Sequence, residues 1–122
     1  MILTQAQLIK KCREWQKILR LQDWDIDVKI SREWDFIVKG RIGEISHNHE
    51  HKHATVRLLD PIDYDPDSYE PQDMEIDLVH ELLHLHFPDD AFNLQSNWEI
   101  LYEQAINRVA EALVKLKREA GK

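Results

Sequence analysis

The residues that could do chemistry gather in one short segment, HELLHLHF, which covers residues 80–87. His80 and His84 are four residues apart, so on a helix they share one face and can offer two nitrogens to one metal ion. Glu81 lies about 100° further around such a helix, where its carboxylate reaches a water on the metal without occupying a coordination position. The surrounding leucines predict a buried helix, in which unpartnered imidazoles are costly. The segment therefore predicts a zinc site with Glu81 as the general base.

A catalytic zinc ion usually has three protein ligands, so a third ligand must come from elsewhere in the chain. The predicted C-terminal helix offers Glu99 and Glu103. Glu99 follows Ser96 at capping-box spacing and is expected to bond back to the start of the helix. We therefore predict Glu103 as the third ligand, and Asn107 one turn later as a hydrogen-bond partner of a ligating histidine. Asp90, which lies shortly after the HExxH segment, is an alternative third ligand.

These residues resemble a known arrangement. An HExxH segment followed on a later helix by Glu103 and Asn107 resembles the gluzincin zinc metallopeptidases. The short chain and its order of elements resemble the minimal gluzincins and, more loosely, the ImmA/IrrE-type peptidases encoded near phage repressors. The resemblance implies one zinc ion held by His80, His84 and Glu103, and hydrolysis of peptide bonds with Glu81 as the base. It also implies that a substrate peptide pairs with the strand just before the HExxH helix, which would be residues 54–59.

Two other segments carry polar side chains in a pattern. Between two predicted strands lie His47, His49, His51 and His53, on every second residue. On an extended chain they would share one face and could bind a metal, but such a segment is more often a solvated hairpin tip. His53 is the one expected to point inward. The segment 60–72 holds most of the prolines and is expected to be a loop at the rim of a site or a lid over it.

A zinc peptidase also requires a group that stabilises the oxyanion, the negatively charged oxygen that forms on the substrate carbonyl during hydrolysis. The candidates for this role are Tyr64, Tyr69, His53 and His86. His86 is two residues beyond a predicted ligand and therefore points elsewhere on the helix, so the alternatives for it are a supporting contact next to the metal ligands or a role at the helix end.

Periodicity predicts the elements that position these residues. A capping box at residues 4–7 starts a helix that runs to about Leu21. Alternating or β-rich segments predict strands from Trp24, at 36–46 and at 54–59. The HExxH helix is predicted at 73–87 and a long last helix from Ser96 towards Gly121. The expected fold is α+β in one domain, 1–122: an N-terminal helix, a small mostly antiparallel three-stranded sheet, the HExxH helix and a long C-terminal glutamate helix.

Composition excludes several classes of protein. The 122 residues carry a formal net charge of −7, which disfavours binding to a nucleic-acid backbone. The single cysteine, Cys12, cannot form an intramolecular disulfide or a cysteine-based zinc site. No segment has the length and apolar character of a membrane span or of a signal peptide, so a cytoplasmic protein without membrane contact is expected. Oligomeric state is not predicted.

Two other functions remain open at this point. A small domain can use zinc for stability alone, as a non-catalytic interaction module, but such a site has no use for a free Glu81. A metal-dependent RNA hydrolase resembling the YbeY histidine pattern would need a histidine where the chain has Asp90. The negative charge of the chain also weighs against RNA as the substrate.

Overall fold

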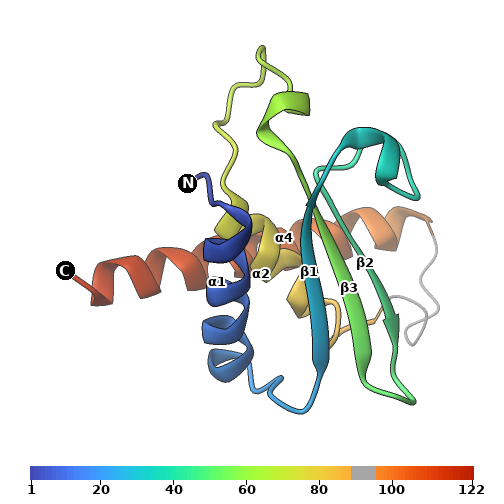
Figure 1. The fold of residues 1–122 in the computed structure, drawn as a ribbon, viewed down its shortest axis with the longest axis vertical. Coiled ribbons are helices and arrows are strands. Elements are labelled where there is room, and N and C mark those ends of the chain that lie inside the picture. Colours follow the sequence, from blue (N-terminus) through green and yellow to red (C-terminus); the bar gives the residue numbers. More distant parts are fainter. Residues whose placement is uncertain (89–95) are drawn as a thin grey trace.

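The computed structural model describes residues 1–88 and 96–122, and it shows an α+β fold (Figure 1). The predicted fold class is therefore confirmed. Two short 3₁₀ turns, at Glu33–Asp35 and Pro61–Asp63, interrupt the connections. The main elements are α1 (Gln5–Ile18), β1 (Asp25–Ser31), β2 (Gly43–Asn48), β3 (His53–Leu59), α2 (Met74–Leu83) and α4 (Ser96–Ala120).

The helix starts follow from local capping. The hydroxyl of Thr4 accepts a hydrogen bond from the Gln7 backbone N–H, and the Gln7 side chain accepts one from the Thr4 N–H, as the predicted capping box requires. Asp73 caps α2 by accepting from the N–H groups of Glu75 and Ile76. These side chains supply acceptors for N–H groups that have no partner inside a helix.

The HExxH helix is shorter than predicted. Regular α-helix ends at Leu83, whereas the sequence pattern extends it to Phe87. His84 is the C-cap residue and keeps helical backbone angles, with φ −62° and ψ −18°. Its N–H bonds to the carbonyl of Glu81 at 3.1 Å, the tighter spacing common in a last turn. His80 and His84 therefore keep the helical relation that the motif needs.

The sheet is mixed, with the order β1-β3-β2. β2 pairs with β3 antiparallel, whereas β1 pairs with β3 parallel, a pairing that the expectation of a mostly antiparallel sheet did not include. β3, which contains residues 54–59, lies in the centre with both edges paired. The prediction that a substrate pairs along this strand is therefore wrong, because no edge is free. Among the described strands, β2 has the open edge next to α2.

The second strand starts later than predicted, at Gly43 rather than Phe36. The buried carboxylate of Glu44 accepts hydrogen bonds from the backbone N–H groups of Ile37 and Val38, at 2.9 and 3.2 Å. These two N–H groups are therefore not available for pairing with a neighbouring strand, and the chain from 36 to 42 forms a loop beside the sheet.

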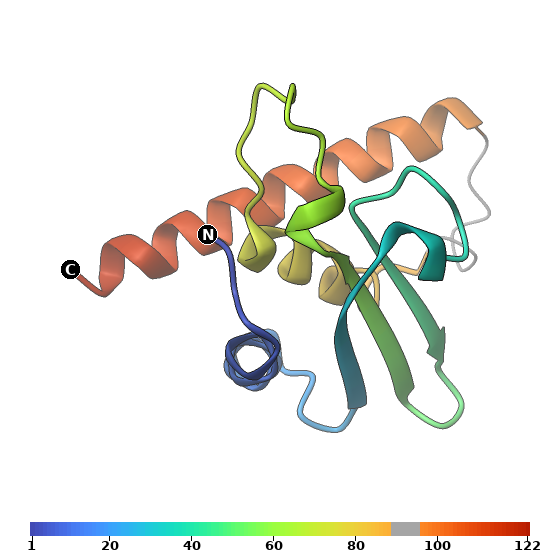
Figure 2. The same ribbon diagram turned by 45° about the horizontal axis from the view of Figure 1, so that its top comes forward.

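Helix α2 lies between the sheet and α4, and α1 packs against α2 and β1 (Figure 2). The buried core combines apolar residues from every one of these elements. Trp15 of α1, Val56 of β3, Leu82 of α2 and Ala110 of α4 are all less than 2% exposed. Within the residues described, no helix is both long and apolar enough to cross a membrane.

The histidine-rich segment forms a hairpin tip, as predicted. β2 ends at Asn48, and the turn that follows includes Lys52 at φ +49°. His53 is exposed, with Nδ1 3.3 Å from the carboxylate of Asp25, its parallel partner on β1. The expectation that it points inward is wrong, because its register places it on the solvent face of the sheet. Only His47 of this run turns towards the cavity described below.

Candidate metal centre

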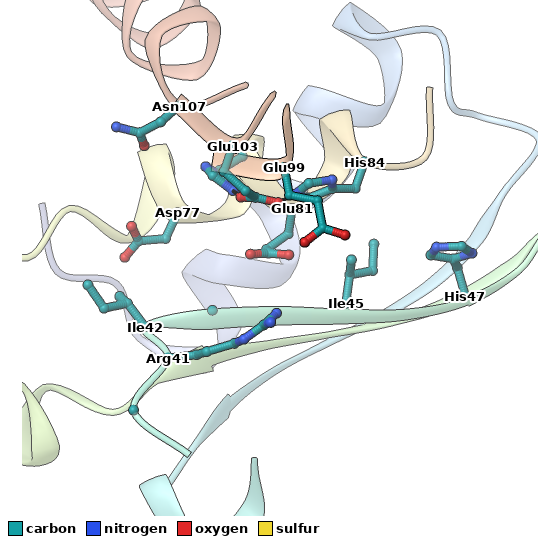
Figure 3. Close-up of a pocket in the computed structure, with 13 residues that line it drawn as sticks. Arg41, Ile42, Ile45, His47, Asp77, Glu81, His84, Glu99, Glu103 and Asn107 are labelled. Carbon is teal, nitrogen blue, oxygen red and sulfur yellow. Dashed lines mark hydrogen bonds and ion pairs between the residues drawn. The ribbon is translucent and has the colours of Figure 1, made fainter. Parts of the chain in front are cut away.

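Helices α2 and α4 bring His80, His84 and Glu103 together (Figure 3). The Nε2 atom of His80 lies 2.9 Å from one oxygen of Glu103, and the Nε2 atom of His84 lies 3.2 Å from the other. One potential ligand atom from each residue falls within 4.8 Å of both others. Across the described ranges, 1–88 and 96–122, this is the one such group of three or more.

The donor set fits a zinc ion. Ligand bonds of about 2.1 Å in a tetrahedral arrangement place two donor atoms about 3.4 Å apart. The separations of Glu103 from His80 and His84 are close to that spacing. Imidazole and carboxylate are ordinary zinc donors, and three protein ligands leave a fourth position for water. Only small side-chain shifts are needed for His80, His84 and Glu103 to surround one ion.

The charges of the three side chains are coupled. Hydrogen bonds from His80 and His84 hold the pKa of the Glu103 carboxyl far below its usual range. Burial opposes the charged form of both imidazoles, but the hydrogen bond to Glu103 and the negative charges of Glu81 and Glu103 together outweigh burial and raise the pKa of each histidine. The carboxylate therefore stays ionised and draws positive charge to the point where the three side chains meet.

Glu81 lies beside this cluster but is not part of it. Its side chain makes no hydrogen bond with any described residue, and the residue is only 8% exposed. Burial raises the pKa of its carboxyl, against the opposing charges of His80 and His84. Gly43 of β2 packs directly against it: a Cβ built on Gly43 would come within 3.2 Å of Glu81 Oε1. Glu81 is therefore a confined, unpartnered carboxylate that faces the cavity (Figure 3).

The cluster opens into a cavity of about 800 Å³ between β2 and the two helices. One wall comes from the end of the 36–42 loop and from β2, with Arg41, Ile45 and His47. Asp77 and Glu99 line the helical side. Asp77 Oδ2 is buried without a partner among the residues described, and burial raises the pKa of this carboxyl to about 7.

The two predicted supporting residues of α4 are close to the cluster. Asn107 lines the cavity and donates a hydrogen bond to Glu111 at 2.8 Å. A side-chain hydrogen bond between Asn107 and His80 is one of the smaller causes of the raised pKa of His80. Glu99 also lines the cavity. The side chain of Ser96, its predicted capping partner, lies outside the described residues, as does Asp90, the alternative third ligand.

One contact of the cluster was missed by the sequence analysis. The hydroxyl of Tyr102 is 3.3 Å from Nδ1 of His84, the nitrogen that points away from Glu103. A partner at this nitrogen fixes the tautomer and the ring orientation of a ligating histidine. Spacing alone did not reveal Tyr102, since it precedes Glu103 directly and adjacent helical residues point about 100° apart.

None of the four predicted oxyanion groups lines the cavity. Tyr64 bonds within its own loop, and Tyr69 is fully exposed. The Nε2 atom of His86 lies 2.6 Å from the carbonyl oxygen of Leu19 and so joins the end of α1 to the turn after α2. His53 is on the hairpin. These assignments are wrong, because each side chain is engaged or exposed away from the metal cluster.

The proline-rich loop is also separate from the cluster. No residue of the segment 60–72 lines the cavity at His80, although Tyr64 and Gln72 line a second cavity next to it. The loop is tied to the body of the protein by Gln72, whose side-chain amide donates to the Leu59 carbonyl at 2.7 Å. The expected rim position is thus found at the neighbouring cavity.

Comparison with known proteins adds no further assignment. No protein-family model, curated protein or solved structure gave a significant match to this chain. The functional interpretation therefore depends on the residues and geometry of the cavity itself.

Proposed function

We propose that this protein is a zinc-dependent peptidase in which His80, His84 and Glu103 hold the ion and Glu81 is the general base. The observation that carries this proposal is the separation of roles in the cluster. His80, His84 and Glu103 converge on one point, whereas Glu81, next to His80 in the sequence, is buried, has no hydrogen bond to a described residue and faces the cavity. The resemblance of the motif to gluzincins supports the same assignment.

The chemistry follows from what each side chain can do. A zinc ion, when bound, lowers the pKa of a coordinated water and polarises a carbonyl group. Glu81 removes a proton from the attacking water and then delivers it to the departing amine. Its confinement under Gly43 keeps the carboxylate in one place for both transfers. Tyr102 holds the ring of His84, and Asn107 supports that of His80.

The free edge of β2 is the proposed docking strand for the substrate peptide. Gly43, Ile45 and His47 alternate along this strand and line the cavity, so a peptide that pairs with the edge passes the metal cluster. Main-chain pairing of this kind accepts many sequences and fits a protein or peptide substrate. We place the activity in the cytoplasm, in keeping with the lone buried Cys12.

The alternatives have less support from the geometry. A structural zinc site is closed by a fourth protein ligand, and the cluster found within residues 1–88 and 96–122 has three. An open cavity with a free carboxylate is also unnecessary for a purely structural ion. The cavity wall carries several acidic groups, which disfavours an RNA phosphate backbone.

The test is cleavage of an unfolded protein, such as reduced casein, by the zinc-loaded chain. Glu81→Gln should lower the rate by about 10²–10⁴-fold, the usual range for a lost general base, while one zinc per chain remains. Glu50→Gln, the same change at an exposed hairpin residue, is the matched control and should retain full activity. Equal cleavage by Glu81→Gln and wild type would refute the assignment of the base.

A further inference from the structure

Arg41 is the one residue with a permanent positive charge among the described residues that line the cavity. Its side chain extends into the space below Glu81 (Figure 3). The residue is exposed, and its guanidinium forms no hydrogen bond or ion pair with any residue that the structure describes. A free cation thus faces the proposed base across the cavity.

The backbone around Arg41 is held in place. Gly40 has φ +83°, a conformation that other residues rarely adopt, and it turns the chain towards β2. On the other side of Arg41, the carbonyl of Ile42 accepts a hydrogen bond from the Leu59 N–H at 2.8 Å. Gly43 then lets the strand pass close to Glu81. The backbone at Arg41 is therefore held in place, whereas its guanidinium is free to bind a ligand.

The arrangement of the two neighbouring cavities indicates which group of a ligand would lie beside Arg41. A second cavity of about 690 Å³ adjoins the first, and both are lined by Ile42, Asp77 and Asn107. The first cavity extends in the other direction to His47. A bound peptide has room to continue on both sides of Arg41, which favours an internal backbone carbonyl over a terminal carboxylate as the group beside its guanidinium.

We propose that Arg41 is a catalytic residue that donates hydrogen bonds to the carbonyl oxygen of the scissile bond as this oxygen becomes negatively charged. This inference rests on the proposed peptidase function. The water oxygen bonds to the carbonyl carbon, its proton moves to Glu81, and the π electron pair of the carbonyl moves onto the oxygen. When the carbonyl re-forms, the C–N bond breaks and the amine takes the proton from Glu81. The charge on the oxygen exists only between these events, so a donor there acts on the rate rather than on binding.

The first test measures kcat and KM separately for Arg41→Ala, using an internally cleaved peptide. Loss of one oxyanion donor typically lowers kcat by about 10²–10³-fold, and we expect KM to stay within about twofold. Zinc content and thermal unfolding should be unchanged because Arg41 is exposed and unpaired. Arg41→Lys should recover part of kcat. Arg108→Ala removes an arginine whose side chain is 83% exposed and lines neither cavity, and it should behave as wild type.

The second test does not depend on turnover. A phosphinic peptide carries a tetrahedral anion in place of the scissile bond, and its affinity can be measured by calorimetry. Arg41→Ala should weaken its binding at least about tenfold. Binding of the corresponding uncleaved peptide to the Glu81→Gln protein should change little when Arg41→Ala is added. Equal loss for both ligands, or a raised KM with normal kcat, would overturn the catalytic role.

The outcomes separate this inference from the function on which it rests. If zinc-loaded wild type cleaves no peptide, the peptidase proposal and the role of Arg41 both fail. If wild type and Arg41→Ala cleave equally well, and Glu81→Gln does not, the peptidase proposal stands and the role of Arg41 alone is refuted.

Discussion

Each end of helix α2 carries a buried carboxylate, but the surroundings of the two carboxylates differ. At the N-terminal end, Glu75 is 1% exposed and accepts hydrogen bonds from Trp15 Nε1 and Lys117 Nζ, both at 2.9 Å, and from Arg118 at 3.0 Å. At the C-terminal end, Glu81 is nearly as buried but has no hydrogen bond to a described residue. One carboxylate is fully compensated, whereas the other is not.

The pKa directions reflect this difference. Burial acts to raise the pKa of Glu75, but the hydrogen bonds from Trp15, Lys117 and Arg118 and the charge of Lys117 together outweigh burial, so the pKa lies below its usual value of 4.5. For Glu81 burial prevails, and the pKa is raised. A compensated buried charge helps to hold two helices together, whereas an uncompensated one costs stability, a cost that the proposed role of Glu81 as a general base would explain. The α2–α4 pair therefore has a compensated charge network at the N-terminal end of α2, and an uncompensated carboxylate lies beside the cavity at the C-terminal end of α2.

Removal of the charge network around Glu75 should have the largest effect on the free energy of unfolding. Glu75→Ala deprives Lys117 and Arg118 of their buried partner, and we expect the free energy of unfolding to fall by about 2–3 kcal/mol. Urea denaturation measures this change. Glu14→Ala, which removes a half-exposed partner of the same Lys117, should cost less than about 1 kcal/mol. Equal costs for the two variants would show that burial of the network contributes nothing.

Asp77 should show the opposite pH dependence from Glu75. Its folded pKa of about 7 lies above its usual value of 3.8, so its contribution is fully present below pH 3.8 and is lost as the pH rises towards 7. In metal-free protein, Asp77→Asn should therefore gain about 1–2 kcal/mol over wild type at pH 8 and little at pH 4. Thermal unfolding at the two pH values tests the sign. A larger gain at pH 4 would contradict the buried, unpartnered position of Asp77.

A smaller change tests how tightly the carboxylate of Glu81 is positioned beside the cavity. In Gly43→Ala the added Cβ would lie 3.2 Å from Glu81 Oε1 and 3.3 Å from Leu58 Cδ2, so one of these side chains must move. We expect a loss of about 1 kcal/mol in stability and about tenfold in kcat, with zinc content unchanged. Ser46→Ala, an exposed position on the same strand, is the control. Full activity in Gly43→Ala would show that Glu81 does not need its present position.

Local sequence patterns predicted the functional residues that lie on helices. The capping box at Thr4 and the helical spacing of His80 and His84 depend on neighbours within a turn, so they can be recognised without the fold. Glu103 was predicted because the spacing of Glu99 from Ser96 assigned Glu99 to the helix start, and because Asn107 follows Glu103 one turn later. The structure places all three potential ligands in one cluster.

The other wall of the cavity could not be predicted in the same way. The position of β2 depends on pairing with β3 across the sheet and on the hydrogen bonds that the Glu44 carboxylate accepts from the Ile37 and Val38 N–H groups. The local sequence gives no signal for either. Arg41 and His47 reach the cavity through that pairing, and no spacing rule connects them to the HExxH segment. The parallel pairing of β1 with β3 is likewise a property of the whole chain.

The central claim is that α2 and α4 hold one metal ion through His80, His84 and Glu103. Zinc per chain, measured by mass spectrometry after gel filtration, tests it most directly. Wild type should contain one equivalent, and Glu103→Ala should contain little. Glu99→Ala, on the same helix and in the same cavity, should retain the ion. Full zinc occupancy in Glu103→Ala, or a zinc-free wild type after loading with the ion, would contradict the account.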